Sequence, residues 1–254
     1  HLLLLNYNYL FHSFRLLNSK FNFGLNVGGN ASYRTNEGVR FTSEDFKVPT
    51  RPILANTREN TPFYTPLTEK KVNSLYASAS FSYDGFAYLE VSGRNDWSST
   101  LPESNRSYFY PSVGLTFLLT RFIDPNSNMF DLIKLRGNYA QVGNDTGPYQ
   151  LNTLYFVAQD GYLGRTTLSR DDIRKTSELR PENVSSSDFG VELRFLKNRA
   201  FIDFAVYNIK SQDLIYDVPV PAATGFTSFR ENIGEVTNQG VEFLVGGSPI
   251  RSKN

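Results

Sequence analysis

The sequence predicts an all-β protein that forms part of the wall of an antiparallel transmembrane β-barrel. Three observations lead to this fold class. Apolar and polar residues alternate with a period of two in one segment after another. Tyr and Phe supply nearly all of an aromatic content of 15%, whereas Trp occurs once. The joints between the alternating segments fall into a short set and a long set, which is how outer-membrane barrels are built.

The alternating segments give the expected strands in chain order. In residues 21–34, for example, aromatic and aliphatic residues alternate with Asn, Gly, Ser and Arg. Together with two weaker segments the pattern gives about ten strands, suited to the roughly 9–11 residues with which a tilted strand crosses a membrane. The clear segments are residues 21–34, 74–83, 89–94, 111–119, 133–139, 188–195, 202–208 and 241–245, and the weaker ones are 3–9 and 151–157.

The connections differ in length in a regular way. Asp84-Gly85 predicts a tight hairpin turn, because glycine readily takes the positive φ that such turns require. Lys197-Asn198-Arg199 predicts a second short turn, and residues 120–132 form a moderate connection. The long polar connections are expected over residues 35–71, 95–108, 143–187 and 212–239.

The polar faces of these strands carry more charge than a dry protein core tolerates. A water-filled lumen accounts for the charges, and the solvated outside of an ordinary antiparallel sheet is the alternative. The lumen-facing candidates are Arg34, Glu90, Arg136, Glu192 and Arg194.

The composition excludes several classes of function. There is no Cys, so disulfides, thiolate zinc sites and Cys nucleophiles are absent. The only histidines, His1 and His12, lie at the start of the chain, and a net charge of +1 gives no reason to expect a nucleic-acid partner. No run approaches the ~20 apolar residues of a transmembrane helix.

Catalytic patterns are equally sparse. Asp171-Asp172 and the serines before Asp188 have no histidine beside them that could activate a nucleophile, so we interpret them as loop and strand-entry residues. Residues 143–147 lack the alternating acidic ligands of a calcium loop. We therefore expect no enzyme activity, no metal site and no cofactor.

Five motifs resemble the SusC/RagA family of TonB-dependent outer-membrane transporters. They follow one another in family order at plausible spacing, and they are clearest within residues 75–250. Each motif alone is weak, but five in order are specific. The motifs are Val91-Ser92-Gly93-Arg94-Asn95-Asp96-Trp97-Ser98-Ser99, Tyr108-Phe109-Tyr110-Pro111-Ser112-Val113, Lys134-Leu135-Arg136-Gly137-Asn138-Tyr139-Ala140-Gln141-Val142-Gly143-Asn144, Leu179-Arg180-Pro181-Glu182-Asn183 (Arg replaces the family's Lys) and Asn232-Ile233-Gly234-Glu235-Val236-Thr237-Asn238-Gln239-Gly240-Val241-Glu242.

The resemblance implies that residues 1–254 are a partial TonB-dependent receptor barrel domain, under half of a wall of about 22 strands. The family's plug domain, TonB-contacting segment and final strands have no counterpart here, so we interpret the chain as a fragment. The family resides in the bacterial outer membrane, in contact with its lipid. It imports glycan or peptide fragments beneath a SusD-like surface lipoprotein, and the TonB complex acts on the plug.

The long loops hold the candidate substrate contacts, because aromatic rings stack on sugars while polar neighbours satisfy hydroxyls. One group is Arg94, Asn95, Asp96 and Trp97 at a strand end, and the other is Tyr149, Tyr155 and Tyr162. The alternative is an aromatic girdle at the membrane interface, which suits residues 108–110 particularly well and is also the preferred interpretation of Trp97.

Two rival functions remain open at this stage. A passive porin or small free-standing barrel would fold alone in detergent. A soluble carbohydrate-binding β-sandwich would need no detergent. Neither rival accounts for five ordered motifs, and the sequence identifies neither the substrate nor the particular lipoprotein.

Overall fold

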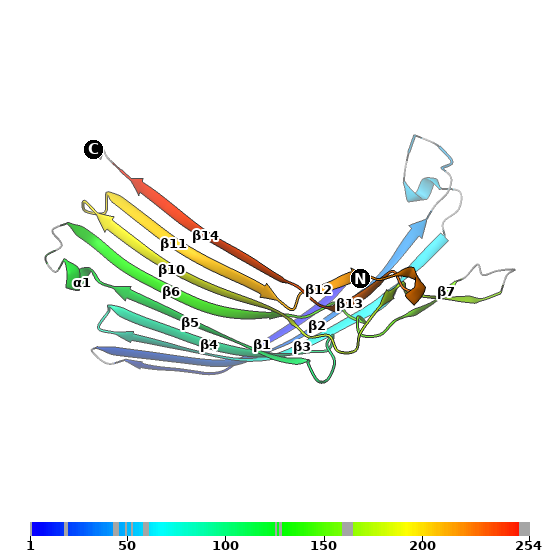
Figure 1. Ribbon diagram of the computed structural model, residues 1–254, viewed down its shortest axis with the longest axis horizontal. Helices are drawn as coiled ribbons and strands as arrows, with labels where there is room; N and C mark the ends of the chain where they lie inside the picture. The colour runs from blue at the N-terminus through cyan, green and yellow to red at the C-terminus, as the bar shows by residue number, and fades with distance from the viewer. Residues whose placement is uncertain are drawn as a thin grey trace.

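The computed structural model describes residues 2–17, 20–42, 46–48, 50–51, 53–57, 61–124, 126, 129–158 and 165–248. Its main feature is one curved antiparallel sheet of nine strands, in the order β1-β2-β3-β4-β5-β6-β10-β11-β14 (Figure 1). These strands are β1 (Leu2–Leu17), β2 (Phe21–Thr42), β3 (Thr61–Tyr83), β4 (Ala87–Ser98), β5 (Ser107–Leu118), β6 (Phe130–Asn144), β10 (Glu182–Phe195), β11 (Ala200–Gln212) and β14 (Glu235–Gly247).

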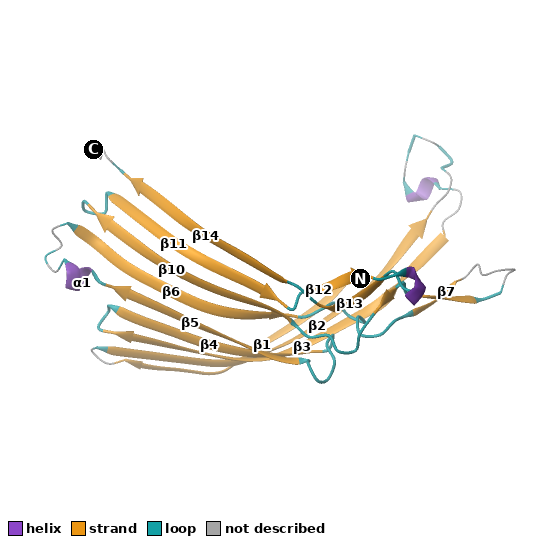
Figure 2. Cartoon of the chain, in the orientation of Figure 1, coloured by secondary structure: helices purple, strands orange, loops and turns teal. Residues whose placement is uncertain are grey.

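The two classes of connection lie at opposite ends of the sheet, as predicted. Figure 2 shows short turns at the left, including that between β3 and β4 and the one that holds α1 (Thr120–Ile123), and longer connections at the right. In the first turn Asp84 and Gly85 have φ angles of 46° and 68°, and in the β10–β11 turn Leu196, Lys197 and Asn198 all have φ 58°. No helix in the described part of the chain is long and apolar enough to cross a membrane.

Strand alternation and register give the sheet one apolar face and one polar face. On neighbouring strands Leu89 pairs with Phe81 and Leu115, whereas Glu90 pairs with Ser80 and Gly114. Many side chains of the apolar face are largely exposed, as expected of a surface that contacts lipid. The apolar face includes Phe81, Leu89, Val91, Val113, Leu115, Phe117, Ile133, Leu135, Tyr139, Phe189, Val191, Phe204, Val206, Val241, Phe243 and Val245.

The apolar face ends at a similar level on several strands, on the side of the long connections. On β6 Tyr139 is followed at the next position of this face by Gln141, and on β11 Val206 is followed by Asn208. On β10 the apolar face continues from Val191 to Phe189, and the next position of this face towards the long connections is Ser187. Such a change from apolar to polar side chains is expected where the outward face of a barrel strand leaves the hydrocarbon of a membrane.

Further small sheets lie beyond this level, among the long connections. β12 (Ile215–Pro219), β13 (Ser228–Asn232) and β9 (Ile173–Arg174) form a three-stranded sheet, and β7 (Tyr155–Ala158) pairs with β8 (Thr167–Arg170). The described residues also include two 3-10 turns, Leu54–Asn56 and Ala222–Thr224.

Two expectations about strand positions change. The weak segment at 3–9 is the middle of β1, a full strand of the wall, but the one at 151–157 contributes only β7, which pairs with β8 outside the wall. The described wall therefore has nine strands. The polar connection expected over residues 35–71 is largely strand, because β2 and β3 stay paired from Asn36 and Thr68 to Thr42 and Thr61.

Most of the buried side chains lie at the end of the sheet with the long connections, since a single layer has no core of its own, whereas Ile133 is buried beside α1 at the other end. Leu179 and Ser98 are fully buried, and Leu101 and Thr100 are nearly so. These residues fasten the connections to the wall.

The pairing of β5 with β6 stops short of the end of both strands. The pairs run from Leu118 and Lys134 to Ser112 and Ala140, and β5 then stays paired only with β4 while β6 stays paired only with β10. The next residue of β5, Pro111, has no N–H to donate to either neighbour. The wall is thus divided between these strands near its outer end.

Candidate functional site

The polar face of the sheet holds paired charges that neighbouring strands bring together. Ser74 of β3, Arg94 and Asp96 of β4 and Tyr110 of β5 share this face by register. Arg94 Nε lies 2.7 Å from Asp96 Oδ1, and Arg94 Nη2 donates to Ser74 Oγ at 2.9 Å. The Tyr110 hydroxyl donates to the other Asp96 oxygen at 2.5 Å. These partners satisfy the Asp96 carboxylate oxygens, although the residue is only 6% exposed.

A second cluster joins the first residue after β6 to the strand ends beside it. The Asp145 carboxylate accepts hydrogen bonds from Lys70 Nζ, from the Ser98 hydroxyl and, at 3.2 Å, from the Thr100 hydroxyl. The Asp145 side chain is 10% exposed and that of Lys70 is 26% exposed. This cluster fastens the start of the 145–181 connection to β3 and β4.

A third group lies lower on the polar face. Arg136 forms a bidentate pair with Asp203, at 2.9 and 2.8 Å, across the intervening strand β10. The pairing passes over Gly190, where an added Cβ would lie 2.6 Å from Arg136 Nε. Glu192 is bonded to Arg194 at 2.7 Å and lies 3.6 Å from Lys134 Nζ. Glycine at 190 therefore leaves the space that the Arg136 side chain needs.

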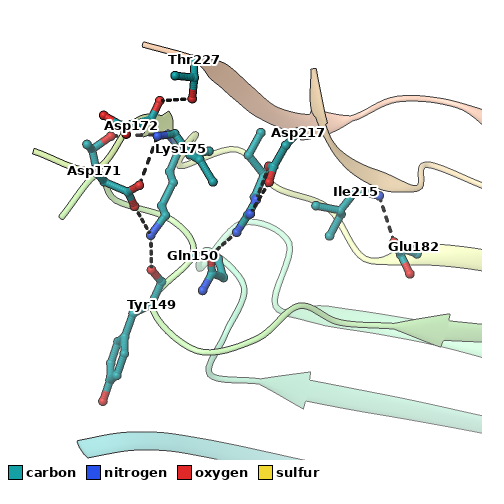
Figure 3. A network of polar contacts seen from close by, with 12 residues as sticks. Tyr149, Gln150, Asp171, Asp172, Lys175, Glu182, Ile215, Asp217 and Thr227 are labelled. Carbon is teal, nitrogen blue, oxygen red and sulfur yellow. Dashed lines mark hydrogen bonds and ion pairs between the residues drawn. The ribbon is translucent and has the colours of Figure 1, made fainter. Parts of the chain in front are cut away.

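The outer connections carry a polar network of their own (Figure 3). Arg230 of β13 donates to both carboxylate oxygens of Asp217 of β12, each at 2.6 Å, and also donates to the side-chain oxygen of Gln150. Lys175 forms an ion pair with Asp171 at 3.0 Å and donates to the Tyr149 carbonyl at 3.4 Å. These contacts join the 145–181 connection to the 213–234 connection through Arg230 and Gln150.

Two carboxyl groups in this network are held in the charged form. Hydrogen bonds from Arg230 outweigh burial and lower the pKa of Asp217 below its ordinary value. Burial acts to raise the pKa of Asp171, but Lys175 and the Ile173 N–H together outweigh it, so this pKa is also lowered. Conversely, Asp217 raises the pKa of Arg230.

The first predicted group of substrate contacts is divided between the two faces of β4. Arg94 and Asp96 lie on the polar face, whereas Asn95 and Trp97 alternate onto the apolar face. Asn95 donates to Ser107 Oγ at 3.0 Å, and Trp97 is 40% exposed. The four residues therefore do not form one cluster.

The predicted tyrosines are separate from that group. Tyr149 has φ 59° and is 49% exposed, and its ring points away from the polar network (Figure 3). Tyr155, on β7, is 65% exposed. Tyr162 lies outside the described residues.

The predicted lumen-facing residues all share the polar face. Arg34 lies opposite Lys70, and Glu90 lies opposite Ser80; both side chains are exposed. Arg136, Glu192 and Arg194 belong to the paired group described above. At 108–110, only Phe109 alternates onto the apolar face expected of a girdle, while Tyr108 and Tyr110 share the face of Arg94 and Asp96.

Sequence reasoning missed the residues that complete the clusters. Asp145 and Lys70 are 75 residues apart, and Arg230 and Gln150 are 80 apart, so only the register and the loop paths bring them together. The pairs of Lys175 with Asp171 and of Arg230 with Asp217 are closer in sequence, but they lie in connections without a regular pattern. Among the described residues no three His, Asp or Glu side chains gather as metal ligands. The candidate site is therefore the polar face itself, whose paired charges and hydroxyls are suited to contact with polar solutes.

Known proteins of the same fold cover nearly the whole chain. It is 29% identical over 227 residues to the TonB-dependent receptor P26 of Formosa agariphila, covering 87% of this chain and 22% of that protein. It is 26% identical over 241 residues to the TonB-dependent receptor SusC of Bacteroides thetaiotaomicron, covering 91% of this chain and 24% of that protein. The chain thus spans less than a quarter of the length of these curated relatives.

Solved structures agree with this architecture. The closed-closed RagAB peptide importer superposes with a TM-score of 0.80 at 23% identity, over 99% of this chain and 28% of that one. The siderophore receptor PirA of Acinetobacter baumannii superposes with a TM-score of 0.61 at 16% identity, over 98% of this chain and 35% of that one. At these identities the likeness shows the fold, a barrel wall.

The family assignment rests on a match along the chain. Residues 4–248 match the family described as TonB dependent receptor-like, beta-barrel. Proteins of this kind are transporters and not enzymes, in agreement with the expectation from the sequence. The apolar and polar faces, the short and long connections and this match lead to one conclusion: the chain belongs to the TonB-dependent receptor β-barrel family of the bacterial outer membrane.

Proposed function

We propose that this chain is part of the wall of a SusC/RagA-type importer that takes up glycan or peptide fragments across the outer membrane. The observation that carries the proposal is the polar face, on which charged side chains pair with one another within and between strands. Such a face lines a water-filled passage for polar solutes. The name of one similar structure, the RagAB peptide importer, supports the peptide class, and the glycan class rests on the resemblance of the motifs to the SusC/RagA family.

In this proposal the wall performs no covalent chemistry. The polar face provides lumen contacts through Arg34, Glu90, Arg136, Glu192 and Arg194. The outer ends of the strands and their connections provide substrate contacts, with Arg94, Asn95, Asp96, Trp97, Tyr149, Tyr155 and Tyr162 as candidates.

The proposed partners follow from the same family membership. A SusD-like surface lipoprotein closes the outer mouth of the barrel, and the TonB complex supplies energy through a plug region outside this chain. The Arg230–Asp217 and Lys175–Asp171 network supports this arrangement, because it gives the outer connections a fixed shape for a partner to contact.

The test uses the full-length gene in its own bacterium. Uptake of fluorescent oligosaccharides and of fluorescent peptides is measured in the parent strain, a deletion strain and a complemented strain, each with and without a protonophore. We expect uptake of one substrate class to disappear on deletion, to return on complementation and to stop when the protonophore removes the energy source. Unchanged uptake of both classes in the deletion strain would contradict the proposal.

The same assay separates the rival functions. A passive porin predicts uptake that depends on the gene but continues in the presence of the protonophore. The soluble β-sandwich is excluded by the fold, because the wall strands form one sheet with an exposed apolar face instead of two packed layers.

A further inference from the structure

The division between β5 and β6 contains a cavity. Beyond the last pair, Ser112 with Ala140, the two strands and the connections above them surround a space of about 300 Å³. This is at the small end of the range of ligand pockets, about 300–1,000 Å³. We call it the β5–β6 notch. Its lining includes Ser104, Tyr108, Phe109, Gln141, Arg180 and Asn183.

Part of the lining of the notch belongs to the lipid-facing side of the wall. Phe109, Gln141 and Asn183 all occupy positions of the apolar face. Tyr108 comes from the opposite face and its ring packs against Gly143, where an added Cβ would overlap ring atoms. Gln141 and Asn183 lie just above the level at which the apolar face ends. The notch therefore lies at the height of the outer-leaflet headgroups.

The lining offers unused neutral hydrogen-bonding groups. Within the described part of the chain, the Asn183 amide and the Ser104 hydroxyl make no hydrogen bond. Gln141 uses its NH₂ group on the Tyr139 hydroxyl, which leaves its carbonyl oxygen as an acceptor. Neutral donors and acceptors around aromatic rings match a saccharide, whose hydroxyls need partners and whose ring faces stack.

The charges of the lining favour a neutral sugar over a phosphate. The guanidinium of Arg180 is already paired with Asp213 at 2.8 Å. Glu182 is also occupied, since its two oxygens accept from the Ile215 N–H and from Asn144. One paired cation beside two carboxylates gives no net attraction for an anion.

An apolar track leads down from the notch on the same face. Phe109 is 64% exposed, and Val113 and Leu115 follow it along β5 at 37% and 43% exposure. A polar cavity directly above an exposed apolar strip fits a molecule with a sugar at one end and acyl chains at the other. We propose that the β5–β6 notch binds the sugar headgroup of an outer-leaflet glycolipid, whose acyl chains lie along β5.

The probe is a monoglucosyl diacylglycerol. Full-length protein is placed in phosphatidylglycerol nanodiscs that contain this glycolipid, and native mass spectrometry counts the lipids that stay bound. The variant is Asn183→Ala combined with Gln141→Ala. Asn208→Ala is the matched control, because Asn208 is an exposed outward-facing amide above the apolar face of β11, outside the notch.

We expect wild type and the Asn208→Ala control to retain the glucosyl lipid, and the double variant to lose at least about tenfold in retention. Only variants that show the wild-type heat-dependent gel shift are compared, so a folding defect is not mistaken for lost binding. Equal retention by the double variant would overturn the proposal, as would equal preference for phosphatidylglycerol. Displacement of the glycolipid by free maltose at equal concentration would assign the notch to soluble sugars instead.

Discussion

Replacing Asp145 with Ala should release the 145–181 connection from the wall. The carboxylate holds Lys70 and the hydroxyls of Ser98 and Thr100, and both hydroxyl residues are buried. Hydrogen bonds to a charged group are worth about 1.5–3 kcal/mol each, and removing one partner of a buried ion pair costs about 3–5 kcal/mol. Because Lys70 is a quarter exposed, water compensates part of this loss, and we expect about 3 kcal/mol in local opening.

Hydrogen–deuterium exchange of the full-length protein measures that opening. A loss of about 3 kcal/mol raises the exchange rate of protected amides in this connection by about a hundredfold, because every 1.4 kcal/mol is a factor of ten. Asp172→Ala is the matched control: Asp172 is exposed, and among the described residues only its backbone carbonyl accepts hydrogen bonds. If both variants exchange like wild type, Asp145 does not fasten the connection.

Three further predictions concern the wall and its outer network. Gly190→Ala should lower the stability of the detergent-solubilised protein in a melting assay by about 1–3 kcal/mol, because the added Cβ would lie 2.6 Å from Arg136. Gly137→Ala should lower it less in the same assay, because the nearest atom to its added Cβ is 3.8 Å away. Phe243→Arg should reduce assembly into liposomes, because a charge on the lipid-facing side costs about 2–4 kcal/mol at mid-bilayer. Leu244→Arg, on the polar face opposite Asp203, should assemble normally. Equal yields of the two variants would refute the assignment of faces. Because the pKa of Asp217 is lowered, its contribution to stability is present above its unfolded pKa of about 3.9 and disappears as pH falls through the folded value. Protease cleavage of the 213–234 connection should therefore rise below about pH 4. Arg230→Gln should weaken that pH dependence.

Local pattern predicted the wall because alternation with a period of two determines which face each residue occupies. Phe81, Leu89 and Val91 fell on one face and Glu90 and Arg94 on the other before any register was known. The same rule separates Trp97 from Arg94, although proximity in sequence had suggested one cluster. Alternation is decisive within a strand, and adjacency is not.

Contacts between connections could not be predicted in this way. Asp145 reaches Lys70 across 75 residues and Arg230 reaches Gln150 across 80, and no local pattern records such distances. The length of β2 and β3 was also missed, because their outer halves carry polar residues on both faces, as a loop does. Once a strand leaves the lipid, its outward face no longer needs apolar residues, and the signal that identified it disappears.

The length of that β2–β3 hairpin has a consequence for access from outside the cell. Strands of 22 and 23 residues extend about 75 Å at roughly 3.3 Å per residue, about twice what a tilted strand needs to cross the membrane. On its outward side the Tyr33 hydroxyl donates to Glu69, on the face that carries apolar side chains such as Phe23 and Phe81 lower on the wall. The outer half is therefore a stalk in the extracellular medium, open to antibodies and to membrane-impermeant labels that never reach the inner half.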